Sequence, residues 1–131
     1  MGGRAGRRRR QGRPGAPGAE PAARLLADEV LPHARAEERT LYRSARRDPD
    51  TRLLVQALIS EHRLLASLTG RLSEPAQPAA TAAQAAAISA LFASHVAKED
   101  SLLLPALERS GADLAALLAR EPRLAGGQCA A

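Results

Sequence analysis

The chain has 131 residues and a formal net charge of +5, which is enough for one domain with a single core and too short for two. Ala and Leu dominate, there is one Tyr, one Phe and no Trp, and β-branched residues are few, so we expect helices and no sheet. Six of the nineteen basic residues are arginines within residues 1–19, which leaves thirteen basic residues against fourteen acidic ones in the remainder. The excess positive charge belongs to a tail, and nucleic-acid binding through it would be unspecific and sensitive to salt.

Three segments are expected along the chain. Residues 1–19 contain Gly, Arg, Pro and Ala with almost no large apolar side chain, which predicts a disordered tail. A helical domain is expected over residues 20–120, followed by a flexible tail over 121–131. We find no apolar run of eighteen residues and no signal-peptide core, so neither a membrane span nor secretion is indicated and the cytoplasm is the expected location. The lone Cys129 cannot form an internal disulfide framework.

The first helix is expected from near Pro21 to about Arg46, with a bend at Pro32, because an internal proline removes one backbone hydrogen bond. The sequence Asp48-Pro49-Asp50-Thr51 predicts a turn, and Asp50 or Thr51 would be the N-cap of the next helix.

The second helix carries His62 among apolar residues spaced three and four apart. Those residues are Leu54, Leu58, Leu65, Leu68 and Leu72. A third helix is expected from about Thr81 to Glu108, with an internal Pro105, and its apolar stripe consists of Ile88, Leu91, Phe92, Leu102, Leu103, Ala106 and Leu107. A short fourth helix is expected over residues 112–120. Short links between long amphipathic helices predict an all-α, antiparallel up-down bundle of three long helices plus the short C-terminal one.

Two His-x-x-x-Glu elements interrupt the apolar stripes, namely His33 with Glu37 and His95 with Glu99. Residues four apart on a helix share one face, with Cβ atoms about 5–6 Å apart, so each pair could bind one cation together. The surrounding sequences, HARAEERTLY and HVAKEDSLLL, are similar enough to be an internal repeat. With His62, the candidate metal ligands are five residues: His33, Glu37, His62, His95 and Glu99.

Each candidate has an ordinary alternative. A histidine on an apolar face can be a core residue that donates to a carbonyl, and the glutamates could pair with Arg35, Arg39 or Arg63, although those arginines lie off the apolar stripe. A buried carboxylate without a partner is costly, and a bound cation removes that cost. Mixed imidazole and carboxylate ligands suit iron, manganese or zinc.

The acidic residues beside these candidates are expected to be accessory. Glu38, Glu61 and Asp100 would pair with arginine or orient a ligand imidazole by hydrogen bonding to its second nitrogen.

Taken together, the segments LPHARAEERTLY, SEHRLL and SHVAKEDSLLLPAL resemble the second, third and fourth helices of the hemerythrin-like HHE cation-binding domains, over roughly residues 22–108. The resemblance implies a four-helix bundle with a non-haem di-iron centre, in which the five candidates are ligands and Glu37 and Glu99 bridge. Family members begin with a further helix that contributes a histidine, whereas this chain has the arginine-rich tail there. Hemerythrins also carry a second histidine where Ala66 stands. Weaker metal binding, a second chain that completes the bundle, and a truncated reading frame all remain open.

The leading functional hypothesis is a non-haem iron protein that binds or senses dioxygen or a related small oxidant. The alternative is a metal-free interaction module that self-associates or packs on a partner helix. An oxidase or peroxidase-like enzyme is less favoured, because such di-iron enzymes use more carboxylates and Glu-x-x-His elements, which these helices lack.

Overall fold

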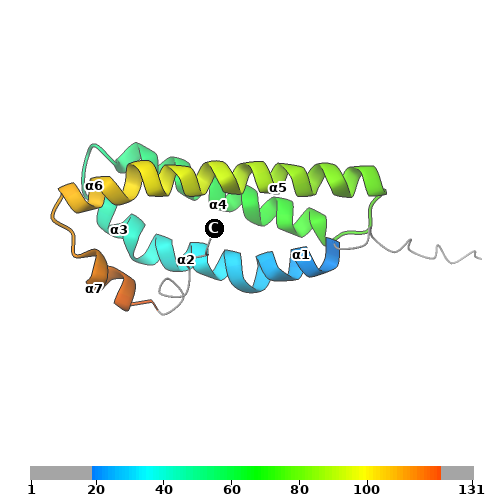
Figure 1. Ribbon diagram of the computed structural model, residues 1–131, viewed down its shortest axis with the longest axis horizontal. Helices are drawn as coiled ribbons and strands as arrows, with labels where there is room; N and C mark the ends of the chain where they lie inside the picture. Colours follow the sequence, from blue (N-terminus) through cyan, green and yellow to red (C-terminus); the bar gives the residue numbers. More distant parts are fainter. Residues whose placement is uncertain (1–18, 122–131) are drawn as a thin grey trace, which may run out of the picture.

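The computed structural model describes residues 19–121, and all of the regular structure in that range is helical (Figure 1). Each of the three long helical segments runs antiparallel to the segment before it and a short helix follows, which confirms the predicted all-α bundle. The two expected tails lie outside the described residues, except that Ala19 begins the first helix and Glu121 follows the last.

The first segment is a chain of short helical pieces rather than one regular helix. It comprises α1 (Ala19–Leu25), η1 (Leu26–Val30), α2 (Leu31–Arg39) and α3 (Leu41–Ala45). The second segment is the regular helix α4 (Arg52–Leu72), and Thr51 is its N-cap by position. The Thr51 hydroxyl does not cap α4, because it donates to the carbonyl of Ala45 at 2.5 Å and so fastens the preceding turn.

The third segment begins three residues earlier than expected, with Pro78 in the first turn, where a missing N–H costs nothing. It consists of α5 (Pro78–Lys98), η2 (Glu99–Leu103) and α6 (Leu104–Arg109). Gly111, with a φ of 78°, ends this segment in the left-handed conformation that glycine adopts freely. The short helix α7 (Leu114–Ala119) follows, and the Asp113 carboxylate caps it by accepting from the Ala116 N–H at 2.9 Å.

Both internal prolines follow a turn of π-helix instead of producing a simple bend. A proline cannot donate to the carbonyl four residues back, and its ring crowds that carbonyl. The residue before each proline bonds five residues back, Leu31 to the carbonyl of Leu26 and Leu104 to the carbonyl of Glu99. The two π turns are not equivalent positions of the sequence repeat, because the first precedes His33 whereas the second begins at Glu99, after His95. Such π turns are frequent at functional sites.

The helix α4 lies between the other two long segments, packing against α1 and α2 on one side and against α5 on the other (Figure 1). Its buried positions alternate at three and four residues: Val55, Leu58, His62, Leu65, Thr69 and Leu72. Two apolar clusters result. One surrounds Leu58 and Leu103, where α3, α4 and α6 meet, and the other joins Ala23, Leu65 and Ile88.

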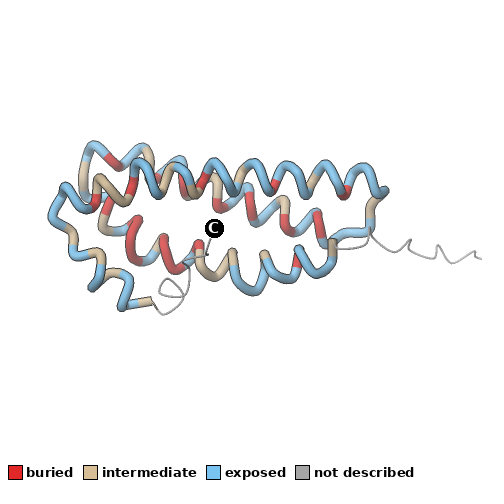
Figure 2. The backbone as a smooth tube through the Cα atoms, viewed as in Figure 1, coloured by how far each residue is buried: buried red, intermediate tan, exposed pale blue. Residues whose placement is uncertain are grey.

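The outward side of α5 is mostly exposed (Figure 2). Two residues assigned to the apolar stripe are on this exposed side, with Phe92 40% and Leu102 52% exposed. Leu102 turns outward because the π turn adds a residue and places Leu103 inside instead. The stretch Pro78–Arg109 is long and apolar enough to cross a membrane by length and composition, with 17% of the apolar window buried. That is a weak indication, and the prediction of no membrane span stays a prediction.

Candidate metal centre

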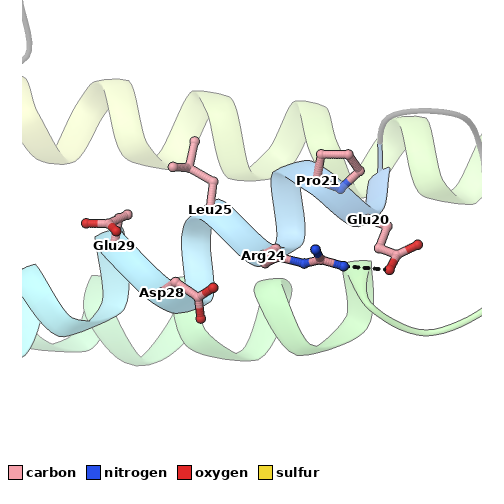
Figure 3. Close-up of a pocket in the computed structure, with 6 residues that line it drawn as sticks. All are labelled: Glu20, Pro21, Arg24, Leu25, Asp28 and Glu29. Carbon is pink, nitrogen blue, oxygen red and sulfur yellow. Dashed lines mark hydrogen bonds and ion pairs between the residues drawn. The ribbon is translucent and has the colours of Figure 1, made fainter.

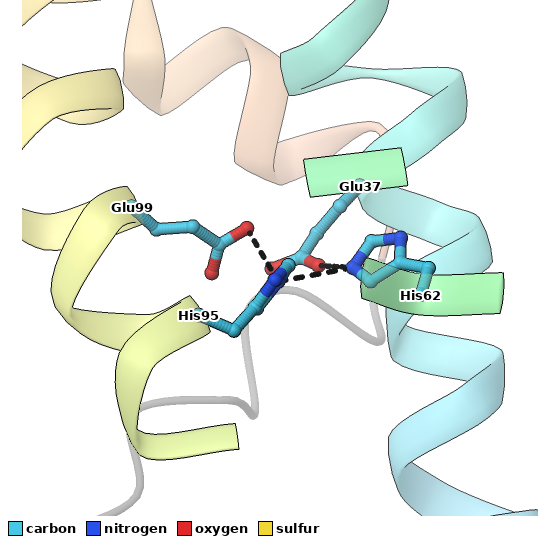
Figure 4. Close-up of side chains that lie close together, drawn as sticks. All are labelled: Glu37, His62, His95 and Glu99. Atoms are coloured by element: carbon cyan, nitrogen blue, oxygen red, sulfur yellow. Dashed lines mark hydrogen bonds and ion pairs between the residues drawn. The ribbon is translucent and has the colours of Figure 1, made fainter. Parts of the chain in front are cut away.

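Four of the five candidate ligands converge between the two apolar clusters (Figure 4). Glu37 comes from α2, His62 from α4, His95 from α5 and Glu99 from the first position of η2. One ligand atom from each of the four lies within 4.8 Å of all the others. Glu37 and both histidines are buried, and the side chain of Glu99 is 14% exposed.

The two imidazoles are fixed from behind by carboxylates on a neighbouring helix. His62 Nδ1 lies 2.8 Å from Glu38 Oε1, and His95 Nδ1 lies 2.9 Å from Glu61 Oε2. Because an ionised carboxylate only accepts, each Nδ1 carries the hydrogen and donates it. Each Nε2 is then an acceptor directed into the cluster, an arrangement typical of histidines that bind metals. Glu38 and Glu61 were expected either to pair with arginine or to orient an imidazole, and in the structure both orient an imidazole.

The second oxygen of Glu61 is also occupied. The Lys98 ammonium donates to Glu61 Oε1, so that this carboxylate joins a lysine and an imidazole of α5. Burial alone would raise the pKa of Glu61, but the hydrogen bonds and charges of Lys98 and His95 hold it below its ordinary value. Glu61 therefore keeps its negative charge and its hold on His95.

The inward atoms form an electron-rich centre. The two Nε2 atoms of His62 and His95 lie 3.1 Å apart, Glu37 Oε2 is 3.4 Å from the first and Glu99 Oε1 is 3.4 Å from the second. Without a cation, two lone pairs at this distance repel unless one imidazole takes up a proton. Burial alone would lower the pKa of His95, but the hydrogen bonds and charges of Glu99 and Glu61 raise it. The donors therefore fit a metal ion, which would use all four lone pairs at once.

The fifth candidate, His33, lies beside this cluster and outside the set of four. Its Nε2 donates to Glu37 Oε1 at 2.9 Å, and its side chain is 32% exposed. The two oxygens of Glu37 thus face different imidazoles, His33 and His62. Burial alone would raise the pKa of Glu37, but the bonds from those two histidines hold it below its ordinary value. The role of all five residues as ligands stays a prediction.

The salt-bridge alternative for the buried glutamates does not match the described contacts. Arg39 pairs with Glu121 at 3.0 Å, and Arg35 and Arg63 are exposed. Asp100 is exposed as well and contributes to neither the cluster nor its support.

Tyr42 also lies at this cluster, a position that helical periodicity does not predict. Its phenol group, 1% exposed, donates to Glu99 Oε1 at 2.5 Å and lies 3.4 Å from His62 Nε2 and 3.3 Å from His95 Nε2. Burial and the charges of Glu99 and Glu37 raise the pKa of this phenol. In a regular helix Tyr42, five residues after Glu37, would point about 140° away from it.

The backbone departs from helical values at Thr40, which separates α2 from α3 and turns Tyr42 inward. Two features of the sequence could have pointed to Tyr42 as a member of the cluster. It is the one tyrosine in the chain, and a buried tyrosine hydroxyl needs a hydrogen-bond partner.

A family model of the hemerythrin HHE cation-binding domain matches residues 4–107. The chain belongs to this family. The match covers more of the chain than the resemblance over residues 22–108 suggested, and its first part, residues 4–18, lies outside the described residues. No curated protein and no solved structure shows a significant match. As a hemerythrin-like domain, the chain has a helical bundle with a His/Glu cluster suited to a cation.

A surface hollow on α1 and η1 is separate from this centre (Figure 3). Its lining residues are Glu20, Pro21, Arg24, Leu25, Asp28 and Glu29. Arg24 donates to Glu20 at 2.9 Å, both side chains are largely exposed, and none of the residues that line the hollow belongs to the His/Glu cluster. The hollow gives no sign of a second metal site.

Proposed function

We propose that this hemerythrin-like chain is a non-haem iron protein that binds or senses dioxygen or a related small oxidant. Glu37, His62, His95 and Glu99 would hold the ion. The single observation that supports the proposal is the convergence of two oriented Nε2 atoms and two carboxylates within 4.8 Å in a buried position. Bound iron would supply the redox chemistry and the position where the oxidant binds. The protein's own part is to orient the donors and to limit access of water.

The described residues supply one full donor set and part of another. Glu37 Oε1 faces His33 at 2.9 Å, so a second ion would have this imidazole and this carboxylate among the described residues. Residues 4–18 contain no His, Asp, Glu or Cys, so a di-iron centre of the kind found in the family would need donors from another chain. We therefore expect at least one tightly bound iron per chain, with a second depending on those donors.

Optical spectroscopy of the full chain tests the oxygen proposal. The protein is loaded with ferrous iron without oxygen and then exposed to air-saturated buffer. We expect an absorption change that is proportional to bound iron and absent from a His95→Ala variant, in which one oriented donor is lost. A ferrous-loaded protein whose spectrum and iron oxidation state do not respond to oxygen would contradict this function while leaving metal binding intact.

Exposed large apolar side chains favour a second candidate, a helical module that associates with a second copy of itself. Each long segment carries an exposed large apolar side chain, with Leu25 on α1 59%, Leu64 on α4 50% and Phe92 on α5 40% exposed. Apolar patches of this kind are uncommon on monomers, and closed two-fold dimers are the commonest assemblies.

Sedimentation of the metal-free protein at tens of micromolar tests this candidate. A dimer that dissociates on Phe92→Glu substitution would support it, with Arg63→Glu, at another exposed position, as the matched control. A strictly monomeric protein would refute it. The two functions are compatible, since a second copy could also complete the metal site.

A further inference from the structure

The phenol of Tyr42 belongs to the same centre as the His/Glu cluster, although neither the sequence pattern nor the family match assigns it a role. Its oxygen lies 2.5 Å from Glu99 Oε1, 3.3 Å from His95 Nε2 and 3.4 Å from His62 Nε2. Three of the four converging donors are thus its direct neighbours. Its ring is parallel to that of His62, at 12° and a centroid distance of 5.3 Å, and this stacking holds the oxygen in place.

The two distances from the phenol oxygen to the imidazole nitrogens are those expected of ligands that share one ion. Donors held about 2.0–2.2 Å from a metal lie about 2.8–3.6 Å from one another at the corners of an octahedron or a tetrahedron. The distances from the Tyr42 oxygen to the two imidazole nitrogens fall in that range, as does the 3.1 Å between the nitrogens themselves. The phenol oxygen is therefore spaced from both imidazole nitrogens as a further ligand of one ion would be.

The hydrogen-bonding needs of this tyrosine do not explain the arrangement by themselves. A phenol has one hydrogen, which goes to Glu99, and when both imidazoles are neutral its oxygen faces two Nε2 atoms that are themselves acceptors, because Glu38 and Glu61 bind the Nδ1 hydrogens. Electron-rich atoms surround the phenol oxygen, and a cation would satisfy them. In the second copy of the repeat the corresponding residue is Leu104, so the repeat itself does not require a hydroxyl at this place.

We propose that Tyr42 is a ligand of the metal centre through its phenol oxygen, giving a donor set of two imidazole nitrogens, two carboxylates and one phenolate. This inference rests on the proposed function, that the cluster holds iron. On loading, the oxygen–hydrogen bond of Tyr42 breaks, the proton leaves to water and the oxygen binds the ion, which a bound cation makes favourable. Three anionic oxygen donors favour ferric iron over softer ions.

Ferric loading of the full chain tests the proposal, because Tyr42 is the one tyrosine in the sequence. Any tyrosinate-to-iron charge-transfer band, and any tyrosine ring vibration enhanced by resonance Raman excitation within that band, must come from this residue. We expect both signals in the ferric protein. The Tyr42→Phe variant keeps the ring stacked on His62 and should lose both signals while retaining measurable iron.

The outcomes separate the two proposals. Ferric protein that contains iron but shows no tyrosinate band or vibration would overturn the role of Tyr42 and leave the iron site standing. A chain that takes up no iron would overturn both. If Tyr42→Phe does not fold, the Raman spectrum of the unmodified protein alone decides the assignment.

Discussion

His95 Nδ1 and Glu61 Oε2 lie 2.9 Å apart across the contact between α5 and α4, and this bond directs the opposite nitrogen of His95 into the cluster. Glu61 is 18% exposed and also accepts from Lys98, so α4 fixes both the rotation and the tautomer of an imidazole on α5. The orientation of His95 is thus set by Glu61, a residue outside the four that converge.

Substitution of Glu61 should therefore weaken metal binding without removing a ligand. We expect Glu61→Gln to lower iron affinity about 10- to 100-fold, because the carboxylate no longer strengthens and orients His95. Competition with a chromophoric chelator measures this affinity. Glu108→Gln, at an exposed glutamate on α6, is the matched control and should leave affinity unchanged. Equal affinities for the two variants would show that Glu61 has no part in orienting His95.

The two histidines of the repeat should differ in importance. His95 contributes one of the four converging atoms, whereas His33 reaches the cluster through Glu37. We expect His95→Ala to abolish stoichiometric iron binding and His33→Ala to retain the first iron with reduced affinity. Iron per chain after gel filtration distinguishes the two variants. Complete loss of iron in His33→Ala would place His33 among the essential ligands instead.

The apolar cluster beneath the site should carry much of the stability. Leu58 is fully buried and packs one turn from His62, so Leu58→Ala should lower the free energy of unfolding by about 2–5 kcal/mol. Leu53→Ala, on the same helix but 76% exposed, should change it by less than about 0.5 kcal/mol. Urea unfolding of metal-free protein measures both. Similar losses for the two variants would mean that α4 is rotated from the orientation described here.

The pH dependence of stability should change sign when metal binds. The groups that face His95 are Glu37 on α2, Glu61 and His62 on α4, Glu99 on its own segment and Tyr42 on α3. Because the folded pKa of His95 is raised above its ordinary 6.5, its protonated form stabilises the metal-free protein below that pH, and the contribution is lost as the pH rises through the folded pKa.

We therefore expect the free energy of unfolding of metal-free protein to fall as the pH rises above 6.5 and through the folded pKa of His95. The lowered pKa of Glu37 acts oppositely, giving stability that is present above 4.5 and lost as the pH falls through its folded pKa. Metal binding requires deprotonated imidazole, so the stabilisation by metal should increase over the same rise in pH. Urea unfolding with and without metal provides the comparison, and parallel pH profiles would contradict the expectation.

The fold and most of the cluster could be predicted because they follow from helical periodicity. The intervals of three and four on α4 place His62 between Leu58 and Leu65, and the structure has the same order on its buried face. His95 and Glu99 were predicted to share a helix face because they are four residues apart. A regular repeat makes such residues visible without coordinates.

The parts that could not be predicted depend on departures from the regular helix. The π turn after Lys98 moves Leu102 outward. The break at Thr40 turns Tyr42 into the cluster, whereas a regular helical period would direct its side chain away from the cluster. The exposure of Phe92 depends on which helix packs against that side of α5, which no local pattern encodes.

The most direct measurement of the central claim is metal content per chain, with solution mass, for the full-length protein reconstituted with iron and for a His62→Ala/His95→Ala double variant. The account predicts at least one iron per chain in the unmodified protein and none in the double variant, with both remaining helical by circular dichroism. An unmodified protein that folds but retains no iron, or a double variant that retains as much iron as the original, would contradict the assignment of this cluster as a metal centre.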